Sequence, residues 1–269
     1  MRRVIKADLF RLKRNKMTYI LLAALVIFSL ISLGSFALLD LSMRYMDAEI
    51  LGAETVALLE QTVPNTVDKY IETFFFGNFL IVFFVLFALI LCSAEYSTGY
   101  IKNTAVNILP RHLSFFSKLI IVAVYVLISY VVVLLLVLGG CALLKVKEVV
   151  NLGGIIKMLI VQFLNNLSLT AFIMMIFYLT RKLPISMIIG LIYAAMGNLL
   201  YVLLSLLTTV AFPKSDFAFS QYTNLGNMTF HINTQASTTD YIRAVIVAIV
   251  FLGISIFFSC RSIDKKDIK

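Results

Sequence analysis

Few side chains in this sequence have the type and spacing that catalysis requires. The two histidines, His112 and His231, lie outside the apolar runs, and neither belongs to an H-E-x-x-H zinc motif. No apolar run holds a carboxylate pair, or a serine with a histidine at the same depth, as acid–base or nucleophilic catalysis needs. The sequence also lacks a G-x-x-x-x-G-K-[ST] phosphate loop. We therefore expect this chain to hold no catalytic site, no metal site and no ATP or other cofactor.

The composition is that of a membrane protein. Hydrophobic residues make up 61% of the 269 residues and charged residues 14%, whereas a soluble domain has about 25% charged residues. A soluble domain of this length has too small an interior to bury so much apolar surface. The net charge of +9 then indicates unequal loops on the two sides of a membrane rather than a nucleic-acid partner. The cysteines are isolated, and we interpret them as small apolar packing residues: Cys92, Cys141 and Cys260.

Six apolar segments are long enough to cross a membrane. A helix that rises 1.5 Å per residue needs about 20 residues to cross an apolar layer of about 30 Å. Because an isolated span must satisfy its own backbone hydrogen bonds, we expect an all-α protein with six transmembrane helices in one domain. The predicted spans are 17–39, 73–94, 119–144, 158–180, 185–211 and 241–260.

The lysines and arginines predict that both termini are cytoplasmic. The chain has 23 lysines and arginines. Seven lie in residues 1–16, three in residues 95–118, two at 181–182 and four after the last span. Cytoplasmic loops carry an excess of lysine and arginine, so we place these four segments on the cytoplasmic side of the membrane. The loops 40–72 and 212–240 are then outside, where we expect either ordered caps over the outer mouth or mobile loops. The outer loop 145–157, with three lysines, goes against the rule.

Residues 1–16 predict an amphipathic helix at the inner surface of the membrane. At 100° per residue, four apolar residues fall on one side and the basic residues on the other, with Asp8 and Phe10 as exceptions. Such a helix lies in the interface with its basic side towards anionic lipid headgroups. The alternative is a plain basic tail that only sets the topology. The four apolar residues are Val4, Ile5, Leu9 and Leu12.

Polar or small side chains inside the predicted spans either join helices or line a cavity. In the fourth span they are Gln162, Asn165, Asn166 and Ser168. In the fifth span a stripe of small residues, Gly190, Ala194 and Gly197, lies beside three polar or aromatic ones. The second span carries phenylalanines at i, i+4 and i+8, which either pack against helices or lipid or form a greasy substrate path. The candidate path residues are Phe79, Phe83, Phe87, Tyr193, Asn198 and Tyr201.

The loop at residues 95–118, EYSTGYIKNTAVNILPRHLSFFSK, carries a recognisable motif. It resembles the loop of ABC-type-2 exporter permeases, which often reads E-x-x-x-G-T-[IL]-[KR], then P followed closely by R, then a small residue and K. Tyr100 stands where that family usually has Thr. The six predicted spans, the basic amphipathic start and the missing phosphate loop agree with the resemblance. The matching residues are Glu95, Gly99, Ile101, Lys102, Pro110, Arg111, Ser117 and Lys118.

The resemblance implies a set of partners. Residues 95–118 would form a cytoplasmic coupling helix that docks on a separate ATPase subunit, which binds ATP and Mg²⁺, and residues 1–16 would form the elbow helix. Two permease chains, identical or different, would pair, with the second and fifth spans lining the path. The alternative for the charges in the loop is that they only set the topology. The implied ATPase-coupling residues are Glu95, Gly99, Ile101, Lys102, Pro110, Arg111 and Lys118.

The expected function is that of the transmembrane subunit of an ATP-driven exporter in a bacterial plasma membrane. The resemblance and the uncharged path favour an amphipathic cargo, such as a peptide, an antimicrobial compound or a lipid-like molecule. One alternative is efflux of small ions or drugs by the same machinery, and another is a secondary transporter or channel. The spans have no ionisable residue in their middles and the chain shows no internal repeat, which argues against a transporter driven by an ion gradient.

Overall fold

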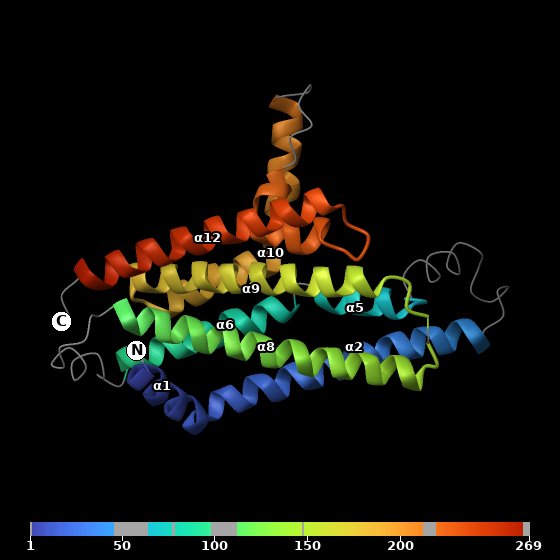
Figure 1. Cartoon of the computed structure of the whole chain (residues 1–269), viewed down its shortest axis with the longest axis horizontal. Helices are drawn as coiled ribbons and strands as arrows, with labels where there is room; N and C mark the ends of the chain where they lie inside the picture. The colour runs from blue at the N-terminus through green and yellow to red at the C-terminus, as the bar shows by residue number, and fades with distance from the viewer. Residues whose placement is uncertain are drawn as a thin grey trace.

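The computed structural model describes residues 2–45, 64–76, 79–97, 112–146, 148–211 and 219–265. Every regular element in these ranges is a helix, as predicted, and the long helices form an elongated bundle (Figure 1). In chain order the elements are α1 (Arg2–Arg14), α2 (Lys16–Tyr45), α5 (Val67–Phe76), α6 (Phe79–Ser97), α8 (His112–Leu143), α9 (Leu152–Thr180), α10 (Leu183–Ala211), the 3₁₀ helix η1 (Phe219–Tyr222), α11 (Asn224–Gly226), the π-helical turn η2 (Asn227–His231) and α12 (Thr238–Lys265).

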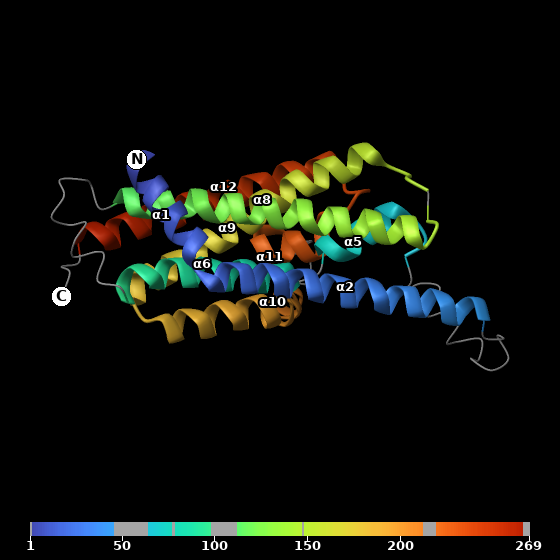
Figure 2. The ribbon, with the colours of Figure 1, turned by 90° about the horizontal axis from the view of Figure 1, so that it is seen from below.

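The two ends of the bundle bring together different parts of the chain. One end, called the α1 end here, holds α1, the end of α6, the beginning of α8, the end of α9 and the end of α12 (Figure 1). The other, called the α5 end, holds the beginning of α5, the end of α8 and the beginning of α9 (Figure 2). This arrangement follows from antiparallel packing of helices that are successive in the chain. The described parts of the segments predicted to be cytoplasmic therefore share one end of the bundle.

The structure confirms four or five of the predicted spans. A bent pair, Val67–Phe75 with Phe79–Ala94, makes a fifth crossing if it is taken as one span with a bend of 41°. The second predicted span, 73–94, therefore corresponds to the end of α5 and most of α6. The four unbroken helices that are long and apolar enough to cross a membrane are Lys16–Leu39, His112–Leu143, Leu152–Thr180 and Thr238–Ile263.

The predicted fifth span, 185–211, is not among the candidate spans found within the described residues. It corresponds to α10, in which Leu183–Met196 forms a shorter apolar helix. Beyond that part, α10 turns away and its last turns project from the bundle (Figure 1). A count of six spans therefore remains a proposal.

Two helices begin before the predicted spans to which they correspond. The helix α9 begins at Leu152 rather than at residue 158, because Asn151 Oδ1 accepts a hydrogen bond from Gly154 N at 2.8 Å and caps it. Lys157 consequently lies exposed on a helix, not in a loop. At the other end, α8 begins at His112. Much of the predicted loop 95–118 is therefore helical, and its residues 98–111 lie outside the described part of the chain.

The predicted loop between α10 and α12 is built into the bundle. Its residues 219–231 form η1, α11 and η2, and residues 223–228 are all buried. They pack against α9, α10 and α12, so they are neither a cap above the bundle nor a free loop. The helix α2 extends into the other predicted outer loop, 40–72, and α5 begins within that loop. Its residues 46–63 lie outside the described ranges.

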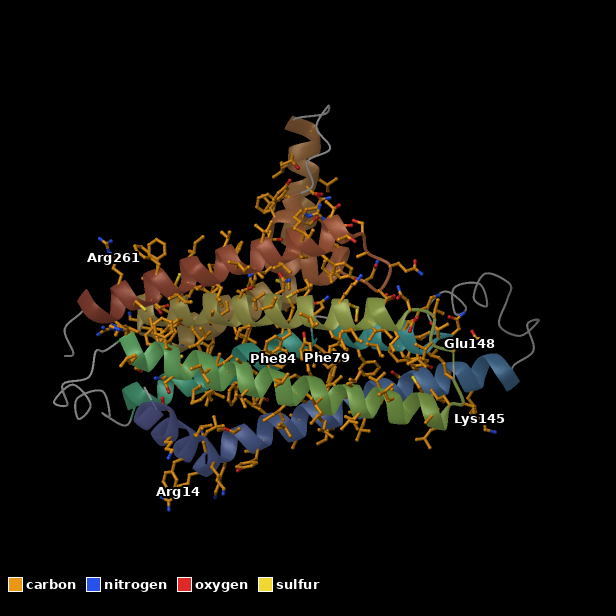
Figure 3. All side chains as sticks on the ribbon, viewed as in Figure 1. Arg14, Phe79, Phe84, Lys145, Glu148 and Arg261 are labelled. Atoms are coloured by element: carbon orange, nitrogen blue, oxygen red, sulfur yellow. The ribbon has the colours of Figure 1, made fainter. Side chains whose placement is uncertain are left out.

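Charges at the ends and an apolar middle mark the outer surface. Arg14 and Arg261 lie towards the α1 end, and Lys145 and Glu148 lie at the α5 end (Figure 3). Of the unbroken spans, α9 is the most enclosed and α2 the least. The exposed middle of the bundle suits contact with lipid tails. It includes, on α8 alone, Leu127, Ile128, Val131 and Leu135.

Candidate functional site

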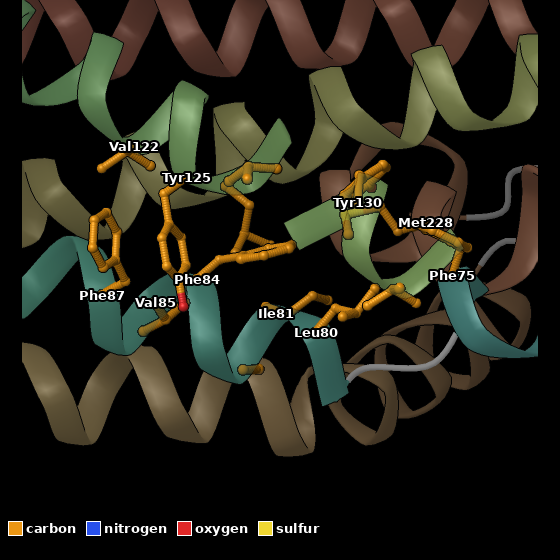
Figure 4. Close-up of a cluster of buried hydrophobic side chains, with 14 of the residues drawn as sticks. Phe75, Leu80, Ile81, Phe84, Val85, Phe87, Val122, Tyr125, Tyr130 and Met228 are labelled. Carbon is orange, nitrogen blue, oxygen red and sulfur yellow. The ribbon is translucent and has the colours of Figure 1, made fainter. Parts of the chain in front are cut away.

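The phenylalanine stripe of α6 contacts two different helices. Phe87 is 2% exposed, and its ring stacks on Tyr125 of α8 with centroids 3.7 Å apart and an interplanar angle of 8° (Figure 4). Phe79 and Phe83 are half-buried, and their ring centroids lie 5.2 and 6.4 Å from that of Phe28 on α2. All three therefore pack between helices within this chain, and their place in a substrate path stays a prediction.

The other three candidate path residues belong to α10. Tyr193 is half-buried, with its ring centroid 6.2 Å from that of Phe172 on α9. Asn198 and Tyr201 lie further along α10, and their side chains are outside the described part of the structure. Gly190 serves close helix packing, since a Cβ at this position would lie 2.8 Å from Val85 Cγ1 on α6.

The polar row of α9 is buried inside the bundle. Gln162, Asn165 and Asn166 are each at most 1% exposed. Asn166 Nδ2 donates a hydrogen bond to Tyr130 OH at 2.7 Å, which joins α9 to α8. Gln162 Nε2 donates to the carbonyl oxygen of Met228 at 2.9 Å, which joins α9 to η2. The row forms the interhelical hydrogen bonds that its spacing suggested.

The same row and the nearby Asn227 of η2 also present acceptors without a partner among the described residues. The side-chain oxygens of Gln162, Asn165, Asn166 and Asn227 have no hydrogen-bond partner among the described residues. Buried polar atoms are nearly always paired, either with protein groups or with water. Each of these oxygens can accept a hydrogen bond from water or from an N–H or O–H group of a ligand. The row is therefore a candidate polar site in the interior of the bundle.

Short-range hydrogen bonds shape residues 219–231, which face this row. Thr223 Oγ1 accepts from Gly226 N at 3.2 Å and caps α11. Asn227 Nδ2 donates to the carbonyl oxygen of Thr223 at 2.9 Å. Ser220 Oγ lies 2.9 Å from His231 Nε2 in a hydrogen bond. Burial lowers the pKa of His231 and so favours its neutral imidazole.

Two carboxylates of α5 tie three parts of the chain together at the α5 end. Asp68 Oδ2 accepts hydrogen bonds from the backbone nitrogens of Val150 and Asn151, both at 2.8 Å, directly before α9. Glu72 Oε1 accepts from Thr234 N at 2.6 Å and also from the Thr234 hydroxyl. Asn151 Nδ2 donates to the carbonyl oxygen of Thr234 at 2.9 Å. These bonds join α5, the beginning of α9 and the chain that leads into α12.

A second buried carboxylate contact lies at the α1 end. Ser117 Oγ of α8 donates to Asp8 Oδ2 of α1 at 2.6 Å, and the two residues are 0% and 3% exposed. One residue further along, Lys118 is 1% exposed, and its Nζ donates to Ser114 Oγ at 2.7 Å. The first two turns of α8 thus contain buried polar side chains, one of which bonds to Asp8 of α1.

Most of the predicted ATPase-coupling residues cannot be placed by the structure. Gly99, Ile101, Lys102, Pro110 and Arg111 lie outside the described residues, and Glu95 lies in α6 with its side chain outside them. Lys118 is the described member of the set, and its side chain is buried inside this chain. The role of the whole set in coupling stays a prediction.

The sequence did not reveal the residues that join neighbouring helices at each end of the bundle. In the sequence Asp8 is only an exception in an amphipathic pattern, and Asp68 and Glu72 are only members of the predicted outer loop 40–72. A signal was present for Asn151, because Asn directly before an apolar run is a typical helix N-cap. For the carboxylates no local signal exists, because their partners lie 82 to 162 residues away in the chain. The separation is 109 residues for Asp8.

These features define a class of protein. The described chain is a helical bundle with several membrane-spanning helices, an apolar outer surface and charges at its ends. Its buried polar groups hold helices together. No group of three or more His, Cys, Asp and Glu side chains that could hold a metal ion occurs within the described ranges. The fold is thus that of a multi-pass membrane protein.

Comparison with known protein families identifies the family to which this membrane protein belongs. The sequence pattern of the ABC-2 family transporter proteins matches residues 4–198. This is well over half of the chain, which therefore belongs to the ABC-2 transporter family and is a membrane permease. The match covers α1 to the first part of α10, and so includes Asp8, Ser117 and the polar row of α9. Among curated proteins, none matches the chain.

Proposed function

We propose that the chain is the transmembrane subunit of an ATP-driven exporter in a bacterial plasma membrane and acts with a separate ATPase subunit. Permeases of this family generally pair with such a subunit. The proposal includes six spans, cytoplasmic termini, a second permease chain, and ATP and Mg²⁺ bound by the ATPase alone. The cargo proposed is amphipathic: a peptide, an antimicrobial compound or a lipid-like molecule.

The observation that carries the proposal is the composition of the α1 end. The basic helix α1 and the two helix ends that flank residues 98–111 meet there, together with the turn at Arg181 and Lys182 (Figure 1). Positive charge of this kind favours the cytoplasmic side. A docking segment for an ATPase must lie on that side, and its movement must reach the spans. The flanking helices α6 and α8 meet both requirements.

The interior of the bundle supports the cargo class. The described spans have aromatic and aliphatic side chains around one uncharged polar row, which suits a molecule with both apolar and hydrogen-bonding groups. ATP binding to the partner would then shift the spans between two arrangements and alternately open the interior.

Co-purification tests the proposal. Replacing residues 99–111 with a Gly/Ser linker of equal length should abolish association with the partner ATPase subunit. A Gly/Ser replacement of residues 51–63, on the opposite predicted side, is the matched control and should leave association intact. If the first variant still binds the ATPase as well as the native chain, residues 98–111 are not the docking element. If the native chain itself binds no ATPase, the proposed function is wrong.

A further inference from the structure

Asp8 is a feature of α1 that an interfacial helix does not explain. It is the only acidic residue of the helix, whose sequence is RRVIKADLFRLKR. Lys6, Lys13 and Arg14 on the same helix are exposed, as are Leu9 and Phe10, whereas Asp8 is 3% exposed. A carboxylate is costly to bury unless it is paired or hydrogen-bonded. Its position therefore calls for a specific partner.

That partner is Ser117 of α8. Ser117 Oγ donates to Asp8 Oδ2 at 2.6 Å, a distance typical of a hydroxyl that donates to a carboxylate, and Ser117 is 0% exposed. Ser117 lies in the second turn of α8, six residues after the segment 98–111. Figure 2 shows α1 crossing the beginning of α8. The contact is therefore close to the proposed docking segment.

The other end of α1 is firmly connected to the first span. Only Asn15 separates α1 from α2. Asn15 Oδ1 accepts from Met17 N at 3.0 Å, and the Asn15 carbonyl accepts from Thr18 N at 3.2 Å, which is N-cap geometry. A capped joint of one residue leaves α1 and α2 little freedom to move independently.

We propose that Asp8 is a positioning residue that links the beginning of α8 to α1, so that movement of segment 98–111 on the ATPase carries α1 and the beginning of α2 with it. The inference rests on the proposed function, since it needs an ATPase to move the segment. It adds a route by which the movement reaches a span that the segment does not adjoin in sequence. The hydrogen bond is the coupling element, and the lipid-facing side chains of α1 remain free to slide along the interface.

The test measures the movement of α1 directly. Spin labels at Lys13 of α1 and Leu179 of α9, both exposed, report the distance between the two helices at the α1 end, with Cys260 replaced by Ser. In the complex with its ATPase, reconstituted in vesicles, we expect the distance distribution to change on addition of ATP with vanadate. The change should be lost in Asp8→Leu and in Ser117→Ala, while co-purification with the ATPase is retained and export falls at least five-fold.

A matched control and a rescue variant separate positioning from general stability. Lys6→Ala, an exposed change on the same helix, should behave like the native chain. The exchange Asp8→Ser with Ser117→Asp keeps a carboxylate–hydroxyl pair and should restore both the movement and export. The inference is overturned if Ser117→Ala and Asp8→Leu keep the nucleotide-dependent distance change, or if the native complex shows none. Absence of ATPase binding by the native chain would instead overturn the proposed function.

Discussion

Gln162 Nε2 of α9 lies 2.9 Å from the carbonyl oxygen of Met228, 66 residues further along the chain. The same nitrogen lies 3.4 Å from the carbonyl oxygen of Ile232. One buried amide thus holds the end of η2 inside the bundle. Because the π-helical turn ends there, these carbonyls have no following turn of helix to pair with, and the amide supplies the missing donor.

Replacing Gln162 should therefore release the segment between α10 and α12. Gln162→Met keeps the length of the side chain but removes the donor, so two buried carbonyls lose their partner, at a cost of about 1–3 kcal/mol in the free energy of unfolding. A thiol-reactive dye added to detergent-purified protein can follow unfolding, because Cys92 and Cys141 are buried in the folded chain. We expect a lower unfolding temperature.

Asn165→Leu is the matched control for Gln162. Asn165 Nδ2 bonds only to the carbonyl oxygen of Val161 in its own helix, at 2.9 Å, and Asn165 Oδ1 has no partner among the described residues. Its removal should shift the unfolding temperature less than Gln162→Met does. Equal shifts in the two variants would show that the bond to Met228 does not hold the segment.

Gly154 should not tolerate a side chain, whereas its neighbour Gly153 should. A Cβ on Gly154 would lie 2.2 Å from the backbone oxygen of Thr234 and 2.6 Å from Asn151 Nδ2, which already bonds to that oxygen. Gly154→Ala must push α9 away from the chain that leads into α12, which we expect to cost about 1–3 kcal/mol. The measurement is the same dye-based unfolding temperature.

Gly153→Ala provides the comparison, since the nearest atom to a Cβ there is Asn151 Oδ1 at 3.8 Å. Alanine is a better helix former than glycine by about 1 kcal/mol, so this variant should be neutral or slightly stabilising. Two variants of equal stability would mean that Thr234 does not lie against α9 as described.

Alanine variants of Phe87 and Phe83 can distinguish a role in helix packing from a role in a substrate path. Phe87 is buried and stacked on Tyr125, so Phe87→Ala should cost about 3–5 kcal/mol in stability. Phe83 is half-buried, and Phe83→Ala should cost clearly less. Stability in detergent and export in vesicles are measured side by side. Packing predicts that export falls only in proportion to folded protein, whereas a path predicts that Phe83→Ala impairs export at nearly native stability.

The sequence by itself determined the class of protein and most of its helices. A chain this apolar with charges between its runs must satisfy its backbone hydrogen bonds as helices in a membrane, and the first, third, fourth and sixth predicted spans are long apolar helices in the structure. These features depend on local composition and length alone. The motif around Gly99 and Pro110 pointed to the family, and the match over residues 4–198 bears this out.

Tertiary structure decided where the helices begin and what the polar side chains do. Local composition predicted α9 from residue 158, but the cap at Asn151 and the carboxylate of Asp68 extend it to Leu152. The roles of Asp8 and Gln162 could not be read locally, because a buried polar group is defined by its partner, and their partners lie 109 and 66 residues away. Only the packed bundle brings such groups within hydrogen-bond distance, and the high cost of leaving them unpaired then fixes the helix pairs that they join.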